Sequence, residues 1–423
     1  MLAPKKIQNF IAIISLILAG EMIFSLPFHI ARYFRPSFLS SFELTNTELG
    51  DIFFYYGIFA FIGYLLGAFI TDKFSAKTLI VSSLIFTGVG GLFLLKGPSV
   101  NELKILYSYW GLTTICLFWS PLIKSTRYIG GNENQGTAFG FLDGGRGLCA
   151  AAVASIGVFI FSSNTDLSIM TTSSFSKPLE QVIIFYAFMT ILAAIFVLLF
   201  LPNVPSQKAK PLKNNWLKKK RLLQSRMIWL QAIVVASSYA CYKGLDHFSL
   251  YLHQVHQYTE QEAASIVAKI AYLRVAGAVF AGLLSNKFQP SIVLASCFVI
   301  ITLNFLAIGL GTNQFSQINL IILGLSSSAL LVFGLRGVYF TLLSETRMPM
   351  SHTGFLVGLI SVIGFTPDIF FAPIAGRLLD YFPDNTGHRV YFYFLGVISI
   401  IGLIASIIIN QSKKEKENFN AFG

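Results

Sequence analysis

Two short stretches, AFITDKF at residues 68–74 and GLLSNKF at residues 282–288, resemble one another at an offset of 214 residues. The same offset relates the stretches ELTNTELGD, at 43–51, and QYTEQEAAS, at 257–265. In each half, the two stretches flank one long apolar run: 43–51 and 68–74 flank the first run, and 257–265 and 282–288 flank the second. Self-similarity at a fixed period identifies a chain built from related structural units. The sequence therefore predicts two related halves, and the apolar runs decide what kind of fold the halves adopt.

The apolar runs fit the hydrocarbon core of a lipid bilayer. Of the 423 residues 54% are hydrophobic and 12% are charged, and the mean hydropathy is +0.67, whereas soluble proteins carry about 25% charged residues. A membrane helix needs ~20 apolar residues, and its backbone groups must bond within the helix. A large buried soluble core is the alternative, but about a dozen such runs recur. We predict an all-α membrane protein with twelve spans, at about 8–33, 49–70, 78–96, 104–123, 136–162, 180–202, 227–252, 263–284, 290–310, 318–342, 353–378 and 389–410.

A basic segment divides the chain. KAKPLKNNWLKKKRLLQSR, at 208–226, holds eight Lys and Arg and no acid. We predict a six-helix bundle on each side of it, and the boundaries follow: 1–202 for the first bundle, 203–226 for the linker, 227–411 for the second bundle and 412–423 for a tail. Two repeated halves with such a linker are the architecture of many secondary transporters.

The basic residues also predict the orientation in the membrane. An excess of Lys and Arg marks cytoplasmic loops, so we expect both termini on the cytoplasmic side of a bacterial inner membrane. The first apolar run contains Glu21 and lacks a small-residue cleavage site, so it is read as a retained span and not a signal peptide. The linker can contact anionic lipid headgroups. No nucleic-acid recognition motif surrounds it, and we expect a monomer.

The loop between spans two and three, AFITDKFSAK at 68–77, is similar to the Gly-x-x-x-Asp-Arg/Lys-x-Gly-Arg/Lys-Arg/Lys signature of the major facilitator superfamily. The matching positions are Asp72, Lys73 and Lys77, and the departures are Ala68, Ser75 and Ala76. The resemblance covers nearly the whole chain and implies two six-helix bundles that rock to give alternating access. It also implies that this loop latches helix ends, and the departures imply a weakened or altered latch. A plain charged loop at the membrane edge is the alternative.

Two further stretches, 121–147 and 361–380, resemble a bacterial nitrate/nitrite-porter-like subgroup, most of whose members have no assigned substrate. Nitrate porters of that group carry an Arg in span two and another in span eight. Span eight here has Arg274, but Ala60 stands at the corresponding position of span two. This departure argues against nitrate as the solute.

Charged residues within the spans are the candidate site, because a charge inside the bilayer is costly and faces a partner or a watery cavity. The predicted solute contacts are Arg146, Arg274, Lys269 and Lys243, with Tyr239, Tyr242 and Trp119 as cavity walls. Bases exceed acids, which favours an anionic or zwitterionic organic solute. Alternatively, Arg274 forms a structural bridge to Glu21 or Asp368, and the aromatic residues serve packing.

The carboxylates Glu21, Asp143 and Asp368 are the predicted proton carriers, since a carboxyl in a low-dielectric site can exchange a proton near working pH. For Glu21 the alternative is a structural hydrogen bond. Asp368 can alternatively be the partner of a base, or a buried partner for an Arg. Pro367 precedes Asp368 and predicts a loosened helix there.

The stretch GTAFGFLDGGRGL, at 136–148, opens span five. Its glycines predict a smooth helix face that packs tightly on a neighbour; they are Gly136, Gly140 and Gly144. Asp143 and Arg146 are i,i+3 neighbours and can pair.

A cytoplasmic gate is predicted from the bases near the inner helix ends. Asp143 is expected to engage one of these bases when the gate closes. The gating set is Asp72, Lys73, Lys124, Arg127 and Arg336, the last of which can alternatively reach the inner headgroups. Gly334 and Gly337 beside Arg336 predict the close approach of another helix.

Span seven contains YACYKGLDHF, at 239–248. Lys243 and Asp246 can pair at i,i+3 spacing. Asp246 and His247 lie close to the predicted outer headgroups, so we expect them to be interface residues.

No enzyme signature competes with transport. The sequence contains no Walker loop, HExxH, metal-spaced Cys/His set or Gly-x-Ser-x-Gly, so we predict a non-enzyme without cofactor or metal. The sequence predicts a secondary active transporter that couples a small solute to an ion gradient, most simply proton symport. An antiporter or exporter, and a non-transporting sensor or lipid-handling protein of the same fold, are the alternatives.

Overall fold

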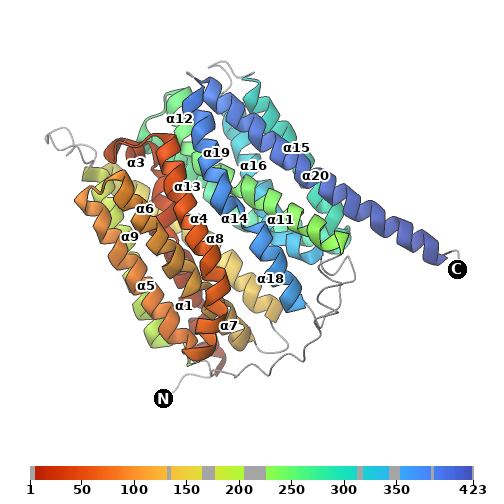
Figure 1. Cartoon of the computed structure of the whole chain (residues 1–423), viewed down its shortest axis with the longest axis horizontal. Helices are drawn as coiled ribbons and strands as arrows, with labels where there is room; N and C mark the ends of the chain where they lie inside the picture. Colours follow the sequence, from red (N-terminus) through yellow and green to blue (C-terminus); the bar gives the residue numbers. More distant parts are fainter. Residues whose placement is uncertain are drawn as a thin grey trace. The chain divides into compact units, whose positions relative to one another are not determined.

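The computed structural model describes residues 5–130, 135–163, 177–203, 225–311, 318–342, 353–382 and 385–421, and every regular element in them is a helix (Figure 1). The α-helices are α1 (Lys5–Met22), α2 (Ile30–Tyr33), α3 (Arg35–Ser41), α4 (Asn46–Lys73), α5 (Ala76–Leu92), α6 (Val100–Gly111), α7 (Trp119–Gly130), α8 (Gln135–Ser163), α9 (Lys177–Phe200), α11 (Arg226–Gly244), α12 (Phe248–His256), α13 (Glu260–Ala271), α14 (Leu273–Lys287), α15 (Pro290–Gly309), α16 (Ile318–Val338), α18 (Thr353–Gly364), α19 (Pro367–Tyr381) and α20 (Thr386–Ala421). Short turns of other helical type are η1 (Ser25–His29), η2 (Phe93–Lys96), η3 (Leu112–Cys116), η5 (Leu245–His247) and η7 (Tyr339–Thr341).

Ten stretches of the described residues are long and apolar enough to cross a membrane, and they coincide with ten of the twelve predicted spans. The other two predicted spans, 104–123 and 227–252, are helical as well, but each is interrupted. The π-turn η3 separates α6 from α7, and the 3₁₀ turn η5 separates α11 from α12. The prediction of an all-helical membrane protein is confirmed.

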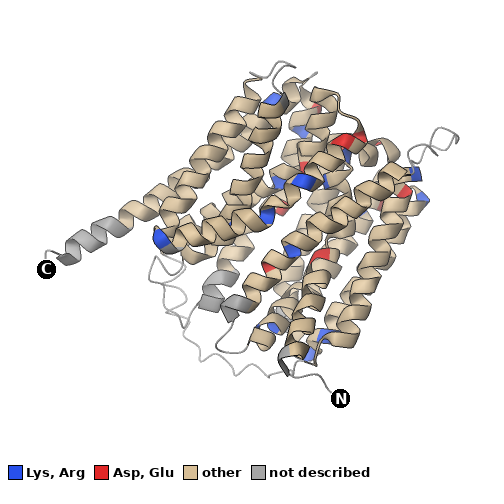
Figure 2. Ribbon diagram, turned by 180° about the vertical axis from the view of Figure 1, so that it is seen from behind, with Lys and Arg blue, Asp and Glu red and all other residues tan. Residues whose placement is uncertain are grey.

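Spans one and eleven, which carry Glu21 and Asp368, are also interrupted. Span one is broken at η1, and span eleven is broken between α18 and α19. Pro367 is the first residue of α19, which confirms the predicted break before Asp368. Figure 2 shows charged residues along the lengths of helices as well as at their ends. Deviations from α-helical geometry free backbone groups and often mark functional sites.

The repeat is visible in local backbone structure. Thr45 and Thr259, related by the offset of 214, each begin a helix with a capping box, in which the threonine hydroxyl accepts from a backbone N–H and a glutamate three residues on reaches back. Two residues earlier, Glu43 and Gln257 have φ values of 51° and 58°. Further repeat-related pairs share their local roles; these are Ser75 and Gln289, the N-caps of α5 and α15, and Gly97 and Gly311, both at φ 63°.

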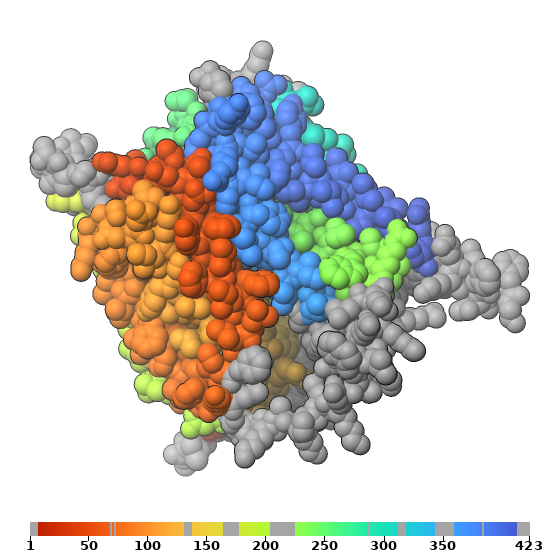
Figure 3. Space-filling model, in the orientation of Figure 1, coloured from red at the N-terminus to blue at the C-terminus, as the bar shows by residue number. Residues whose placement is uncertain are grey.

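The chain divides into two compact units. Unit 1 comprises Met1–Ala209, Asp246–Tyr272 and Ala372–Arg377, and unit 2 comprises Lys210–Leu245, Leu273–Phe371 and Leu378–Gly423. In unit 1, α1 packs on α8 and α9, and α4 packs on α6; Figure 3 shows the side chains of α4 and α6, in shades of orange, on one face of this unit.

Unit 2 is built on a close contact between α14 and α16. A Cβ atom on Gly277 would lie 2.2 Å from the carbonyl oxygen of Leu330, so only glycine fits there. The predicted approach at Gly334 and Gly337 is also confirmed, since Cβ atoms there would lie 3.1 and 3.2 Å from Ala281 and Ala278. α11 packs on α18 and α20, which brings spans seven and eleven together.

The predicted glycine face of α8 is wrong in its register. Cβ atoms on Gly140 and Gly144 would meet nothing within 4 Å. The surroundings of Gly136 are not among those that the structure describes. The close contact is made one residue later, where a Cβ on Gly145 would lie 2.5 Å from Ile17 of α1. One residue turns the helix by about 100°, so α8 presents Gly145 and Arg146 to α1.

Candidate functional site

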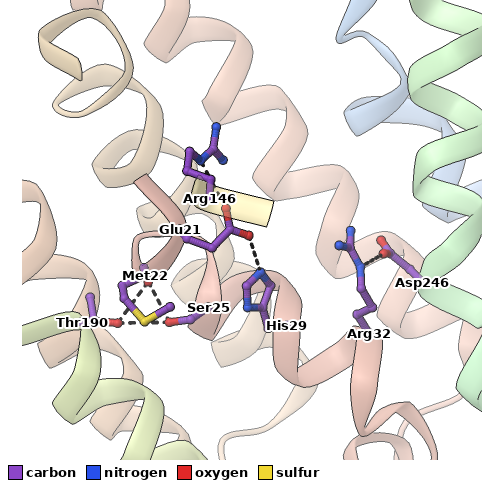
Figure 4. Close-up of polar contacts among 8 residues, drawn as sticks. All are labelled: Glu21, Met22, Ser25, His29, Arg32, Arg146, Thr190 and Asp246. Atoms are coloured by element: carbon purple, nitrogen blue, oxygen red, sulfur yellow. Dashed lines mark hydrogen bonds and ion pairs between the residues drawn. The ribbon is translucent and has the colours of Figure 1, made fainter. Parts of the chain in front are cut away.

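Three buried ionisable side chains form a cluster in unit 1. Glu21 of α1 lies at its centre, with its Oε2 3.2 Å from Nε of Arg146 on α8 and its Oε1 3.2 Å from Nε2 of His29 in η1 (Figure 4). Glu21 and His29 are 2% exposed and Arg146 is 9% exposed. A carboxylate is thereby held between one permanent and one titratable base.

The break in span one brings His29 to Glu21. Pro27 has no N–H, so within the π-turn the carbonyl of Met22 loses its i+5 backbone donor. The hydroxyls of Ser25 and Thr190 donate to this carbonyl instead, at 2.7 and 3.1 Å (Figure 4). Side chains of η1 and α9 therefore satisfy the carbonyl at the end of α1, three residues before the π-turn that contains His29.

Arg146 presents an open edge. Its Nε donates to Glu21, and its guanidinium lies 5.8 Å from the ring centre of Phe24. Within the described part of the chain, its two terminal nitrogens make no hydrogen bond to protein, and Figure 4 shows them beyond the atom that contacts Glu21. A guanidinium fork can bind a carboxylate or phosphate through two parallel N–H···O bonds. Gly20 makes room, since a Cβ there would lie 3.0 Å from Cδ of Arg146.

A second set of polar contacts in unit 1 lies at the far end of span one. Nε of Arg32 lies 2.5 Å from Oδ1 of Asp246 (Figure 4), and Ser37 donates to Glu260. Asp246 and His247, in η5, are buried, so the expectation of interface residues is wrong. Asp246 takes Arg32 as a partner, which the spacing within span seven could not indicate.

Unit 2 holds a corresponding cluster around Asp368. Its Oδ1 lies 3.4 Å from Nζ of Lys243, and the hydroxyl of Tyr239 donates to both carboxylate oxygens at 2.9 and 3.1 Å. This pairing matches the alternative in which Asp368 meets a base. Arg274 is also buried in this unit.

Arg336 extends the unit 2 cluster through an aromatic stack. Its guanidinium carbon lies 3.9 Å from the ring centre of Tyr242, which is within range of a cation–π interaction. Tyr242 in turn stacks on Tyr239 at 6.0 Å. Arg336, expected in the gating set, is thus linked by rings to the residues expected to contact the solute.

The other predicted residues are scattered. Nζ of Lys124 donates to the carbonyl of Thr71 at 3.3 Å, which ties α7 to the end of α4. Asp143 and Trp119 are half-buried, whereas Lys73, Arg127 and Lys269 are exposed, and the side chain of Asp72 lies outside those described.

The sequence reasoning missed His29, Arg32 and Arg35, all buried near the end of span one. Two signals were available. Three basic side chains occur within PFHIARYFRP, at 27–36, and a proline opens the stretch. Bases beside a helix-breaking residue in a span indicate a polar internal site.

The fold and the buried charges define a membrane protein of many helices with ionisable groups in its interior. The profile of the Major Facilitator Superfamily matches residues 10–367, and the chain belongs to this family. The Inner membrane protein YihN of Escherichia coli is 26% identical over 413 residues, which are 95% of this chain and 96% of that protein. The chain is accordingly a multi-pass protein of a bacterial inner membrane.

Solved structures show the same fold. The crystal structure of the nucleoside transporter NupG superposes with a TM-score of 0.75 at 12% identity, over 96% of this chain and 100% of that chain. A D-xylose-proton symporter superposes with a TM-score of 0.72 at 14% identity, over 96% of this chain and 97% of that chain. These structures show the fold, and membership of the Major Facilitator Superfamily identifies the chain as a secondary transporter.

Proposed function

We propose that this chain carries a small anionic or zwitterionic organic solute across the inner membrane by alternating access, in symport with protons. The observation that carries the proposal is that the two terminal nitrogens of Arg146 make no hydrogen bond to the described part of the protein. A buried guanidinium fixed through Nε by Glu21 offers both terminal nitrogens to a ligand. A planar anionic group is the chemistry that such a fork selects.

The charges of unit 2 support a negatively charged solute. Among the described residues, Tyr239 and Tyr242 contact the acid Asp368 and the base Arg336, Lys243 pairs with Asp368, and Arg274 is a further buried base of this unit. Bases exceed acids in this set, and an anionic ligand offsets part of the excess. Lys269 and Trp119 stay in the proposed solute-binding set.

Proton coupling is proposed for Asp143 and Asp368 and for the cluster that contains the third predicted carboxylate, Glu21. Glu21 and Asp368 both lie beside bases, so the charge of each cluster depends on nearby ionic contacts. One of the solved proteins of the same fold is a D-xylose-proton symporter. The latch and gate are proposed at Asp72, Lys73, Lys124, Arg127 and Arg336.

The remaining features of the proposal follow the sequence predictions. They are cytoplasmic termini, two six-helix bundles at 1–202 and 227–411 joined by a lipid-contacting linker, a monomeric state, and membership of the nitrate/nitrite-porter-like subgroup. Nitrate itself is not proposed as the solute, because Ala60 stands where an Arg would be needed.

The first test is binding. Purified full-length protein in detergent is screened by thermal shift against monocarboxylates, phosphate esters and zwitterionic amino acids. We expect at least one of these compounds to raise the melting temperature of the wild type and not of Arg146→Ala. Arg226→Ala, at the exposed start of α11, is the matched control and should respond like the wild type. A ligand that stabilises Arg146→Ala equally well would contradict the proposed anion contact.

The second test is flux. Wild-type protein in liposomes should accumulate the best compound of the screen when the pH outside is below the pH inside. Binding without flux would contradict transport and favour the sensor alternative. Flux that runs outward against the proton flow would favour the antiporter or exporter.

A further inference from the structure

We infer that His29 is the proton-binding residue of the unit 1 cluster and that Glu21 acts as its fixed counter-ion. This inference rests on the proposed function and names the site at which the proton is held. It reassigns the proton from a carboxylate to a ring that the sequence reasoning did not consider. The contacts around Glu21 carry the argument.

Glu21 is bound to a base that cannot change its charge. An arginine guanidinium stays protonated in proteins, and Nε of Arg146 donates to Oε2 of Glu21 in a site that is almost closed to water. A permanent positive charge in direct contact favours the ionised carboxylate. Glu21 therefore holds its negative charge while Arg146 stays in place, and the proton must bind elsewhere.

His29 is the group beside Glu21 that can change its charge. Imidazole gains and loses its second proton close to neutral pH. Nε2 of His29 lies 3.2 Å from Oε1, the oxygen of Glu21 that Arg146 does not contact. The neutral ring carries one hydrogen, and the proton taken up from water occupies its second nitrogen. The imidazolium that forms is then paired with a carboxylate that is already ionised.

Among the described residues, the ionisable groups that contact His29 from the neighbouring helices do not compete for this proton. The elements packed against η1 are α1, α2, α5 and α9. α2 contributes the ring of Tyr33 at 5.7 Å and the base Arg32, which pairs with Asp246. α9 contributes the ring of Tyr186 at 6.2 Å. α5 has no ionisable residue after Lys77, its second residue. Tyrosine exchanges its proton near pH 10, so His29 is the titrating group.

The charge balance explains how a proton and an anion would move together. The formal charges of Glu21, Arg146 and neutral His29 sum to zero, and protonation of His29 raises the net charge of the cluster to +1. A monoanion bound to the terminal nitrogens of Arg146 returns the net charge to zero. A net charge in a low-dielectric interior is costly, so the empty cluster and the cluster loaded with both ligands are the favoured forms. One proton is thereby matched to one negative charge of the solute.

The experiment is a titration of histidine in the intact protein. The chain has six histidines, which are labelled with carbon-13 at Cε1 and followed by NMR in detergent micelles from pH 5 to pH 9. His29→Gln identifies the signal of His29 by its loss. We expect this signal to titrate in the wild type, and to move its midpoint to lower pH by about one unit or more in Glu21→Gln, since the carboxylate favours the imidazolium.

His253→Gln is the matched control. His253 lies half-buried in α12, and its Nδ1 is 2.7 Å from the carbonyl of Tyr258. This variant should leave the midpoint of His29 unchanged. A His29 signal that does not titrate between pH 5 and 9, or whose midpoint is the same in Glu21→Gln, would overturn the inference. The titration needs no solute, so His29 can behave as expected while the flux test fails, and the two proposals are judged separately.

Discussion

His29 and Lys243 occupy corresponding positions in the two halves of the chain, because the offset of 214 that relates the repeated stretches also relates these two residues. Each places a nitrogen close to a carboxylate oxygen, at 3.2 Å from Glu21 and 3.4 Å from Asp368. Three residues further on, the same offset relates Arg32 to Asp246, which form an ion pair within unit 1.

The difference between the two positions is chemical. His29 shares its carboxylate with Arg146, whereas Lys243 shares its carboxylate with the hydroxyl of Tyr239. A free imidazole gains its second proton near neutral pH, whereas a free ammonium loses its proton at about pH 10.4. The repeat thus supplies one backbone position twice, with a histidine beside the carboxylate in unit 1 and a lysine beside the carboxylate in unit 2.

The largest effect is expected from Asp368→Asn. This change removes the carboxylate that faces buried Lys243, and breaking a buried pair from one side costs about 3–5 kcal/mol. The apparent melting temperature in detergent should fall by several degrees. The double variant Lys243→Met, Asp368→Asn should recover much of the loss, and a double variant as unstable as Asp368→Asn would show that the pair is not the cause.

Glu21→Gln should differ from Asp368→Asn in its pH dependence. Without Glu21, protonated His29 would lie beside Arg146 with no carboxylate between them. His29 would then bind a proton less readily in the folded variant than in the unfolded chain, where it is protonated below about pH 6.5. The loss of stability should therefore be larger at pH 5.5 than at pH 8, whereas the loss in Asp368→Asn should be similar at both. Equal losses at the two pH values in Glu21→Gln would contradict the role of His29.

His29→Lys makes the unit 1 position resemble that of unit 2. The cluster then carries its extra positive charge at every pH from 5 to 8. We expect the affinity for the best monoanion of the thermal-shift screen to become independent of pH, whereas the wild type should bind more weakly as pH rises. Lys77→Arg, a charge-conserving change at the edge of the predicted latch, is the control. A pH dependence retained in His29→Lys would place the titrating group elsewhere.

The smallest effect tests the repeat itself. Gly97 and Gly311 both have φ values of 63°, in a region that alanine adopts only with strain. Changing either one to alanine should cost about 1 kcal/mol, seen as a drop of about 1–4 °C in melting temperature. The two losses should be similar, and a loss at one position only would show that the repeat does not extend to that turn.

The sequence alone was sufficient for the spans, the repeat, the break at Pro367 and four of the buried charges, which are Glu21, Arg146, Lys243 and Arg274. The pairings were not predictable, because they depend on helix rotation. α8 turns Gly145 and Arg146 to α1, one residue away from the predicted face at Gly144. Arg146 consequently meets Glu21, an acid 125 residues earlier in the chain, which local spacing could not reveal.

Exposure was equally hard to predict. Lys269 and Arg274 lie in the same predicted span, yet the first is exposed and the second is buried. The span is broken between α13 and α14, so the two residues belong to different helical segments. The prediction placed both residues on one regular helix, and the break explains why their exposures differ.

The most direct test of the account is whether solute entry carries a proton through His29. Wild-type and His29→Gln proteins are placed in liposomes that contain a pH-sensitive dye, at equal pH on both sides and with the membrane potential clamped. The best monoanion of the screen is then added outside. The account predicts that uptake by the wild type acidifies the lumen and that His29→Gln loses this acidification. Uptake by the wild type with no change of internal pH would contradict it.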